Sequence, residues 1–281
     1  MMKNDGHIDD IDVKKANIRH HDIEAEFFER AHPEGSSIYE KSKVLESISF
    51  IVENSGTTDL CVDVGCGTGF IPGFELPIYR AVVAIDISSR MIDATLRRLN
   101  SDSLNLMICD ADFLPFKNEM ADMVSVSSVL HHLPKPFNTM TEMCRILKKR
   151  GFLYVTREPS YYRLRRFFHF FDLIIVQSLS KVIRDLLNFK SEFTEPKVKI
   201  QGLDYAKVDV HYPNGLRVEE LTGFLKYRHM KVISAYSYHW VYPDSNKSLL
   251  NRLVSNSNFV VEKMPLSDRL GRYVSIIAQK I

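Results

Sequence analysis

Cysteine is scarce in this sequence of 281 residues, which has four copies and no C-x-x-C pair. No run of Cys and His residues has the spacing of a zinc site, so we expect no metal centre. Few scattered cysteines beside apolar runs are typical of reduced thiols, which favours a cytoplasmic protein. An excess of charge is also lacking, because 37 Lys and Arg balance 35 Asp and Glu. A net charge of +2 gives no reason to expect a nucleic-acid partner.

No apolar run is long enough to span a membrane. The most apolar stretch, residues 167–182, is interrupted by His169, Asp172 and Lys181. Residues 1–12 are polar and acidic, which is unlike a signal peptide. An apolar content of 45% and a charged content of 26% are nevertheless typical of a globular protein.

Short apolar runs alternate with helical patterns along the first half of the chain. The runs are residues 60–64, 82–87, 104–108, 123–126 and 152–155. The helical patterns are residues 40–54, 88–99 and 137–147, and Ser88 is a plausible N-cap. Alternation of this kind predicts an α/β fold with a doubly wound, Rossmann-like parallel sheet that helices cover on both faces.

The same pattern divides the chain into four parts. Residues 1–36 form an N-terminal lead and helix, with the first 20 or so interpreted as a polar, frayed segment. Residues 37–159 form the α/β core. Residues 160–216 break the alternation and are interpreted as an insertion. Residues 217–281 return to the core with a helix at 218–228 and strands at 232–238 and 273–278.

A glycine-rich loop follows the first predicted strand. Its sequence is Val62-Asp-Val-Gly-Cys-Gly-Thr-Gly69. Glycines allow a sharp turn and a close approach to a ligand, which in such sheets binds at the carboxyl end of the strands. A dinucleotide-binding loop would have Gly or Ala at position 70, where this sequence has Phe. Asp63, just before the first glycine, is also unusual for such a loop.

Acidic residues end the next two predicted strands. Asp86 suits a bidentate hydrogen bond to two ribose hydroxyls. Asp110 can accept a hydrogen bond from the exocyclic amine of adenine. Together with Asp63 these carboxylates describe a site for an adenosine that carries no pyrophosphate, because their charge would repel one.

These motifs resemble those of the class I S-adenosylmethionine-dependent methyltransferases, of the ubiquinone/menaquinone-biosynthesis type (methyltransferase type 11). The matching segments are Asp63-Val-Gly-Cys-Gly-Thr-Gly, Ala84-Ile-Asp-Ile-Ser, Asp110-Ala-Asp-Phe-Leu-Pro-Phe and Val129-Leu-His-His-Leu-Pro. The resemblance covers residues 20–157 and, more weakly, 217–281. It implies a seven-stranded sheet with an antiparallel last strand, a helical insertion after the fifth strand, and S-adenosylmethionine as cofactor.

The resemblance also implies roles for individual residues. Gly65 and Gly67 would lie beside the methionine end of the cofactor, Asp86 on the ribose, Met91 against the adenine face, Asp110 and Ala111 at the adenine edge, and Ser127 near the sulfonium. The full set of expected cofactor-binding residues is Asp63, Gly65, Cys66, Gly67, Gly69, Asp86, Ile87, Met91, Asp110, Ala111 and Ser127. One departure concerns the helix after Gly69, which Pro72 and Pro77 should keep short.

Three residues are candidates for acid–base catalysis. His131 or His132 could act as a general base toward the methyl acceptor, or could cap the next helix and pack beneath Pro134. Glu158 could also face the acceptor, or could form a salt bridge or a hydrogen bond within its loop.

The acceptor and the role of the insertion stay open. Absence of a D/N-P-P-Y/F motif after the fourth strand disfavours nucleobase amines, and favours O- or C-methylation of a small-molecule or lipid-like acceptor. Residues 161–182 are rich in Arg and aromatic residues, which favours a lid or a homodimer face, or else a peripheral contact with a membrane. The alternatives to an enzyme are a non-catalytic cofactor-binding or interaction protein and, less favoured, a nicotinamide-dependent oxidoreductase.

Overall fold

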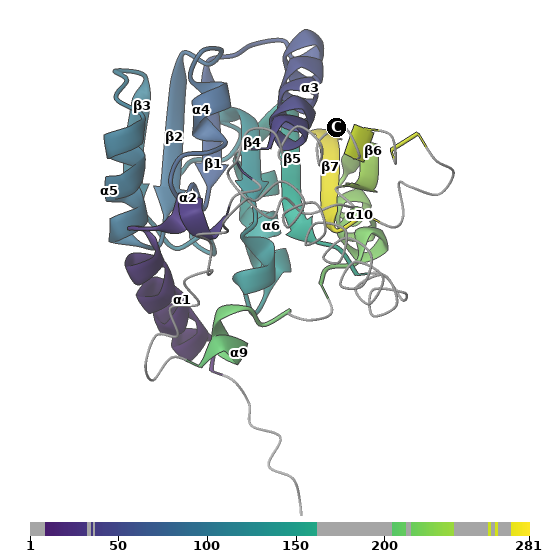
Figure 1. Ribbon diagram of the computed structural model, residues 1–281. Coiled ribbons are helices and arrows are strands. Elements are labelled where there is room, and N and C mark those ends of the chain that lie inside the picture. The colour runs from purple at the N-terminus through teal and green to yellow at the C-terminus, as the bar shows by residue number, and fades with distance from the viewer. Residues whose placement is uncertain are drawn as a thin grey trace, which may run out of the picture.

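A seven-stranded sheet with strand order β3-β2-β1-β4-β5-β7-β6 forms the centre of the computed structural model (Figure 1). The structure describes residues 9–32, 35, 37–161, 204–211, 215–238, 258–259, 262–263 and 271–281. The strands are β1 (Leu60–Val64), β2 (Ala81–Asp86), β3 (Leu104–Ile108), β4 (Ala121–Ser127), β5 (Leu147–Pro159), β6 (Met230–Tyr238) and β7 (Tyr273–Lys280).

The direction of the strands follows the predicted fold. Strands β1 to β5 pair in parallel. The last strand, β7, pairs antiparallel with both β5 and β6. The doubly wound, Rossmann-like sheet and its antiparallel last strand are therefore confirmed.

Two apolar cores cover the faces of the sheet. On one face α3 (Ile38–Asn54) and α4 (Pro72–Glu75) pack their apolar side chains against β1, β2 and β5. On the other face α6 (Pro136–Ile146) and α10 (Val218–Tyr227) pack against β1, β4, β5 and β7. Alternate residues of β1 join different cores, Cys61 the first and Val62 the second, because side chains alternate across a strand.

Local signals place two helices as the sequence predicts. The α5 helix (Ser89–Arg98) begins at Ser88, whose side chain accepts a hydrogen bond from the N–H of Met91. The α4 helix has four residues and begins at Pro72, where a missing N–H does no harm. Its shortness agrees with the prediction from the two prolines.

The interpretation of the first 20 residues as a frayed lead is wrong from residue 10 onward. Residues Asp10–Glu24 form α1, and a short α2 (Phe28–Ala31) follows it. Only Val13, Asn17 and Glu24 of α1 are buried, so the helix lacks the apolar stripe from which helices are usually predicted. The capping signal was present, because the side chain of Asp9 accepts a hydrogen bond from the N–H of Ile11.

Most of the predicted insertion, including residues 162–203, lies outside the described residues, so its interpretation as a lid, a dimer face or a membrane contact stays a prediction. Its described end forms α9 (Tyr205–Val208), which packs against α1 at the lower end of the sheet in Figure 1. Among the helices that the structure describes, none combines the length and hydropathy needed to cross a membrane.

Candidate active site

A cavity of about 590 Å³ lies at the carboxyl ends of β1, β2 and β4, next to α1. Its volume is in the range of small-molecule sites, roughly 300–1,000 Å³. The predicted residues that line it are Asp63, Gly65, Cys66, Gly67, Asp86, Ile87, Met91, Asp110, Ala111, Ser127, His131 and His132. Two predicted residues, Gly69 and Glu158, are not among the lining residues. The fold thus brings most of the predicted site residues together around one cavity.

The three loop glycines after β1 differ in what surrounds them. Gly65, Gly67 and Gly69 have φ angles of 73°, 54° and 82°, which L side chains rarely adopt. A Cβ at Gly65 would lie 2.2 Å from a methyl carbon of Val129, and one at Gly69 would lie 2.7 Å from a methyl carbon of Leu99. A Cβ at Gly67 would meet nothing within 4 Å. Gly65 and Gly69 therefore allow close packing, whereas Gly67 leaves space on the cavity side.

Asp86 connects the end of β2 to this loop. Its Oδ2 accepts a hydrogen bond from the N–H of Gly67 and its Oδ1 accepts one from the N–H of Ser88, both at 2.9 Å. Burial raises the pKa of Asp86, and the two N–H groups oppose that rise. A carboxylate oxygen can accept two hydrogen bonds, so Asp86 can hold the loop and still accept from vicinal hydroxyls.

Asp63 supports the loop from within the protein. Its carboxyl group and that of Glu75 on α4 share one hydroxyl, that of Ser125, at 2.7 and 2.6 Å. The hydroxyl has a single proton and can donate to one of them only, so the other carboxyl must itself carry a proton. Burial raises the pKa of Glu75 to about 7 and that of Asp63 well above its ordinary value. A proton is therefore held beneath the glycine loop.

Asp110, at the adenine end of the expected site, is already engaged. The Nζ of Lys14 on α1 lies 2.6 Å from its Oδ2 and 2.8 Å from Asp112. Burial tends to lower the pKa of Lys14, but the two carboxylates raise it above its ordinary value. This contact ties α1 to the turn after β3 and places a positive charge at the edge of the cavity.

His131 and Glu158 form a buried pair. The Nδ1 of His131 lies 2.8 Å from Oε2 of Glu158, and the Glu158 carboxylate also accepts hydrogen bonds from the N–H groups of Val129, Leu130 and His131. Glu158 is completely buried, so it lies behind His131 and does not face the cavity. The carboxylate fixes the ring with Nδ1 as the donor, which leaves Nε2 as an acceptor.

His132 is held differently. Its Nδ1 donates to the carbonyl oxygen of Val208 on α9 at 2.7 Å. Burial, with help from His131 and His21, lowers the pKa of His132 well below its ordinary value, so the ring is neutral at pH 7. The ring of His132 packs against that of His131, with centroids 4.0 Å apart. His132 thus connects the cavity wall to the end of the predicted insertion.

The structure adds residues to the site that the sequence did not indicate. Arg157 lines the cavity with its guanidinium carbon 4.8 Å from the centre of the Phe70 ring. The α1 and α2 segment contributes Lys14, Asn17, His20, His21, Glu24, Phe28 and His32. A spacing of four residues between His20 and Glu24 was the available signal, but it requires that the segment be a helix.

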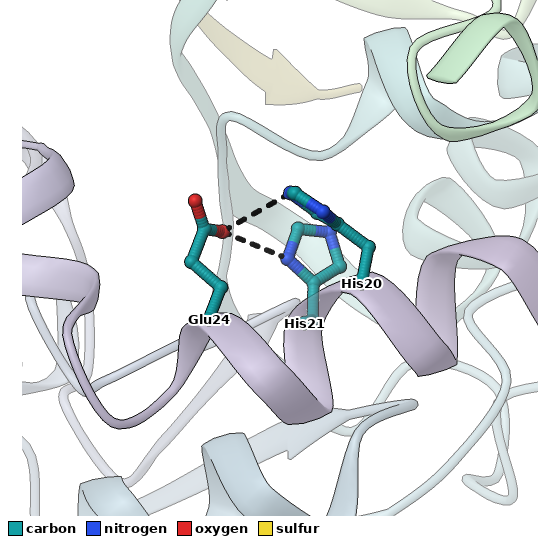
Figure 2. Close-up of side chains that lie close together, drawn as sticks. All are labelled: His20, His21 and Glu24. Atoms are coloured by element: carbon teal, nitrogen blue, oxygen red, sulfur yellow. Dashed lines mark ion pairs between the residues drawn. The ribbon is translucent and has the colours of Figure 1, made fainter. Parts of the chain in front are cut away.

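Glu24 is the centre of a histidine cluster on this segment. Its Oε2 lies 3.4 Å from His20 Nε2 and 3.4 Å from His21 Nδ1 (Figure 2). Its Oε1 lies 3.1 Å from His32 Nε2. Burial tends to raise the pKa of Glu24, but the three imidazoles hold it well below its ordinary value. The side chain is therefore a carboxylate at neutral pH, and it faces the cavity.

Comparisons with known proteins agree with this geometry. Residues 62–155 match the family model described as a methyltransferase domain. An uncharacterised chloroplastic methyltransferase of Arabidopsis thaliana is 35% identical over 101 residues, which are 33% of this chain and 29% of that protein. A demethylmenaquinone methyltransferase of Clavibacter sepedonicus is 28% identical over 125 residues, which are 43% of this chain and 51% of that protein.

The chain thus spans about a third to a half of the length of these two relatives. A solved structure of a Bacillus halodurans protein described as a methyltransferase is similar with a TM-score of 0.52 and 16% identity, over 84% of this chain and 99% of that one. At this identity, the structural similarity shows a shared fold alone. The family resemblance inferred from the glycine loop and the strand-end acids is confirmed, because residues 62–155 match a methyltransferase domain and the chain is similar, at modest identity, to demethylmenaquinone methyltransferases.

Proposed function

We propose that this chain is an S-adenosylmethionine-dependent methyltransferase that methylates a small-molecule or lipid-like acceptor on oxygen or carbon. One observation carries the proposal. The open space at Gly67, the carboxylate of Asp86 and the side chain of Met91 meet in a single cavity within the matched domain. This arrangement suits an adenosine with a short charged tail, and the charge of Asp86 and Asp110 disfavours a pyrophosphate beside them.

The lining of the cavity supports the cofactor-binding roles expected for all the proposed residues except Gly69. Gly65 and Gly67 would lie beside its methionine end, Asp86 would accept from the ribose hydroxyls, and Met91 would contact the adenine. Ser127 and Cys66 line the space between these groups. Ile87, Asp110 and Ala111 also line the cavity and would contact the adenine, and Asp110 would have to keep or exchange its contact with Lys14. Gly69 acts only through the packing of the loop.

When bound, the cofactor supplies a methyl group on a positively charged sulfur, which is its own leaving group. The chain then has to hold the acceptor in line with the methyl group, exclude water and remove a proton from the acceptor. His131 suits the last task, because its Nδ1 is fixed on Glu158 and its Nε2 is available as an acceptor. Glu158 is a positioning residue in this account.

The acceptor class rests on the cavity and on the relatives. Around the polar groups the cavity wall includes apolar side chains such as Phe28, Ile71 and Val129. The Clavibacter sepedonicus relative is named for demethylmenaquinone, and the reduced form of a quinone carries two hydroxyl groups on an aromatic ring. We therefore propose a phenolic or enolic acceptor, and we expect no nucleic acid to bind.

A reducing compartment is consistent with the cysteines. Cys61, Cys66, Cys109 and Cys144 are all free thiols, and three of them are buried. Burial raises the pKa of the Cys66 thiol, so it lines the cavity in its neutral form. We propose the cytoplasm as location. A homodimer and a membrane contact through residues 161–182 stay predictions, since that segment lies almost entirely outside the described residues.

An assay with S-adenosylmethionine labelled on its methyl group tests the proposal. The chain is incubated with a short-chain naphthoquinol, a simple phenol and a duplex DNA as acceptors, and the products are separated by mass. We expect label in the naphthoquinol or the phenol and none in the DNA. Label in the DNA alone would contradict the acceptor class, and absence of cofactor binding would contradict the proposal itself.

A further inference from the structure

The histidine cluster on α1 has the composition and shape of a metal site. His20, His21 and Glu24 occupy positions i, i+1 and i+4 of the helix, so the glutamate lies one turn beyond both histidines. Figure 2 shows the three side chains on one side of the helix, with both imidazole rings beside one carboxylate oxygen of Glu24. Imidazole nitrogen and carboxylate oxygen are the ligands of borderline divalent cations such as Zn²⁺.

The distances match those between ligands of one ion. One possible ligand atom from each of His20, His21 and Glu24 lies within 4.8 Å of the other two, and His20 Nε2 and His21 Nδ1 each lie 3.4 Å from Oε2 of Glu24. Bonds of roughly 2.0–2.2 Å at tetrahedral angles separate two ligand atoms by about 3.4 Å. Both nitrogen–oxygen distances therefore equal the separation expected for two ligands of one ion.

The surroundings also favour an ion. Glu24 is buried, and its second oxygen is held by His32 Nε2 at 3.1 Å, which fixes the orientation of the carboxylate. Groups that orient a ligand in this way are usual around protein metal sites. The cluster is also on the cavity wall, with the ring of His21 5.0 Å from that of His132.

We propose that His20, His21 and Glu24 hold one divalent cation of the Zn²⁺ class, with a fourth position open to the cavity. Three protein ligands and one open position are typical of sites that bind an exchangeable oxygen ligand. The open position takes water or an anionic oxygen of a small molecule. This site goes beyond the proposed methyl transfer and does not depend on it, since its ligands come from α1 and not from the matched domain.

The alternative is a network of hydrogen bonds in which the imidazole N–H groups donate to the carboxylate. The two accounts differ in one respect: binding of a cation releases the protons from the ligand nitrogens and needs the charge of Glu24. A neutral amide at position 24 keeps the size of the side chain and most hydrogen bonds. It removes the charge that a cation requires.

The test uses the full chain without a polyhistidine tag, stripped with a chelator and titrated calorimetrically with ZnCl₂. Three variants accompany the wild type: Glu24→Gln, His20→Gln and, as a matched control, Glu26→Gln, whose side chain is exposed two residues further on. We expect one tight Zn²⁺ equivalent in the wild type and in the control. Glu24→Gln and His20→Gln should weaken that equivalent at least about tenfold, since each loses a ligand. Bound Co²⁺ should show the intense visible absorption of a tetrahedral site in the wild type and in the Glu26→Gln control, and not in the two ligand variants.

Equal Zn²⁺ affinity in the wild type and the two ligand variants would overturn the proposal, as would the absence of a tight equivalent in the wild type. Circular dichroism spectra show whether each variant is folded, and two independent variants guard against the failure of one. S-adenosylhomocysteine is titrated into the same samples. Cofactor binding without Zn²⁺ binding rejects the metal site alone, whereas Zn²⁺ binding without cofactor binding rejects the proposed methyl transfer alone.

Discussion

The two walls of the cavity are built in opposite ways. The wall formed by the glycine loop, Asp86 and Met91 comes from consecutive strand-to-helix turns, each set by residues close in sequence. The opposite wall combines α1, the loop with His131 and His132, and the end of the insertion at Val208, which are held by contacts such as that between His132 and Val208. The first wall is the part of the site that a short sequence motif can specify. The second depends on the whole fold and is where we expect acceptor choice and proton transfer.

If this division is correct, His131→Gln should change turnover and leave cofactor affinity unchanged. The variant keeps a polar group of similar size but has no imidazole to take the proton. Loss of a general base typically lowers the rate by 10²–10⁴-fold, so we expect kcat to fall about 1,000-fold, or about 4 kcal/mol. Steady-state kinetics with the acceptor found in the labelling assay measure kcat, and a calorimetric titration with S-adenosylhomocysteine measures cofactor affinity. A tenfold loss of cofactor affinity with unchanged kcat would place His131 on the other wall.

The buried carboxyl pair beneath the glycine loop should make stability depend on pH. The pKa of Glu75 rises from an ordinary value of 4.5 to about 7 through burial. A carboxyl with a raised folded-state pKa stabilises the fold while protonated, so its contribution is complete below pH 4.5 and is lost as the pH rises through 7. We expect Glu75→Gln to be more stable than the wild type at pH 8 by up to about 3 kcal/mol, at 1.36 kcal/mol per pKa unit.

Urea denaturation at pH 5 and pH 8 measures that difference, with Glu53→Gln on the exposed face of α3 as the control. The advantage of Glu75→Gln should be confined to the higher pH. An equal effect at both pH values would show that Glu75 carries no displaced proton.

Asp86→Ala tests the first wall directly. The change removes both oxygens that would accept from the ribose, and charged hydrogen bonds contribute about 1.5–3 kcal/mol each. We expect the affinity for S-adenosylhomocysteine to fall about 100-fold. The variant also loses the contacts to Gly67 and Ser88, so Asp86→Asn, which keeps one acceptor oxygen, serves as the milder comparison. Affinity equal to that of the wild type in a folded Asp86→Ala variant would show that the ribose is held elsewhere.

The loop glycines provide the smallest and most local test. Both Gly65→Ala and Gly67→Ala place a side chain at a positive φ, which costs roughly 1–2 kcal/mol. Gly65→Ala also drives a Cβ to 2.2 Å from Val129, so we expect it to be less stable than Gly67→Ala by about 2 kcal/mol. Gly67→Ala should instead lower the affinity for the cofactor by more than its loss of stability would explain. Thermal unfolding with and without S-adenosylhomocysteine separates the loss of stability from the loss of cofactor affinity. Equal changes of both quantities in the two variants would contradict the different roles of the glycines.

The sheet and the cofactor wall could be predicted because their signals are local. Each strand is a short apolar run, Ser88 caps α5 through the third residue after it, and Asp86 lies where β2 ends. Side chains at consecutive carboxyl ends of parallel strands meet whatever the rest of the chain does. The position of these residues therefore follows from order and spacing.

The α1 helix and the role of Glu158 could not be predicted in the same way. The α1 helix is stabilised by polar contacts with residues about a hundred positions away, as in the bonds from Lys14 to Asp110 and Asp112. Its sequence therefore resembles that of a solvated segment. Glu158 was predicted as a candidate toward the acceptor because it follows the fifth apolar run. In the structure β5 continues to Pro159, and three backbone N–H groups from the loop after β4 hold the carboxylate inside the protein.

Calorimetric titration of the full chain with S-adenosylhomocysteine and, separately, with NAD tests which cofactor the glycine loop binds, because the fold, the motifs and the matched domain all point to this wall of the cavity. We predict one site per chain for S-adenosylhomocysteine, and no measurable heat with NAD. Binding of NAD with no binding of S-adenosylhomocysteine would contradict the account and would assign the glycine loop to a dinucleotide.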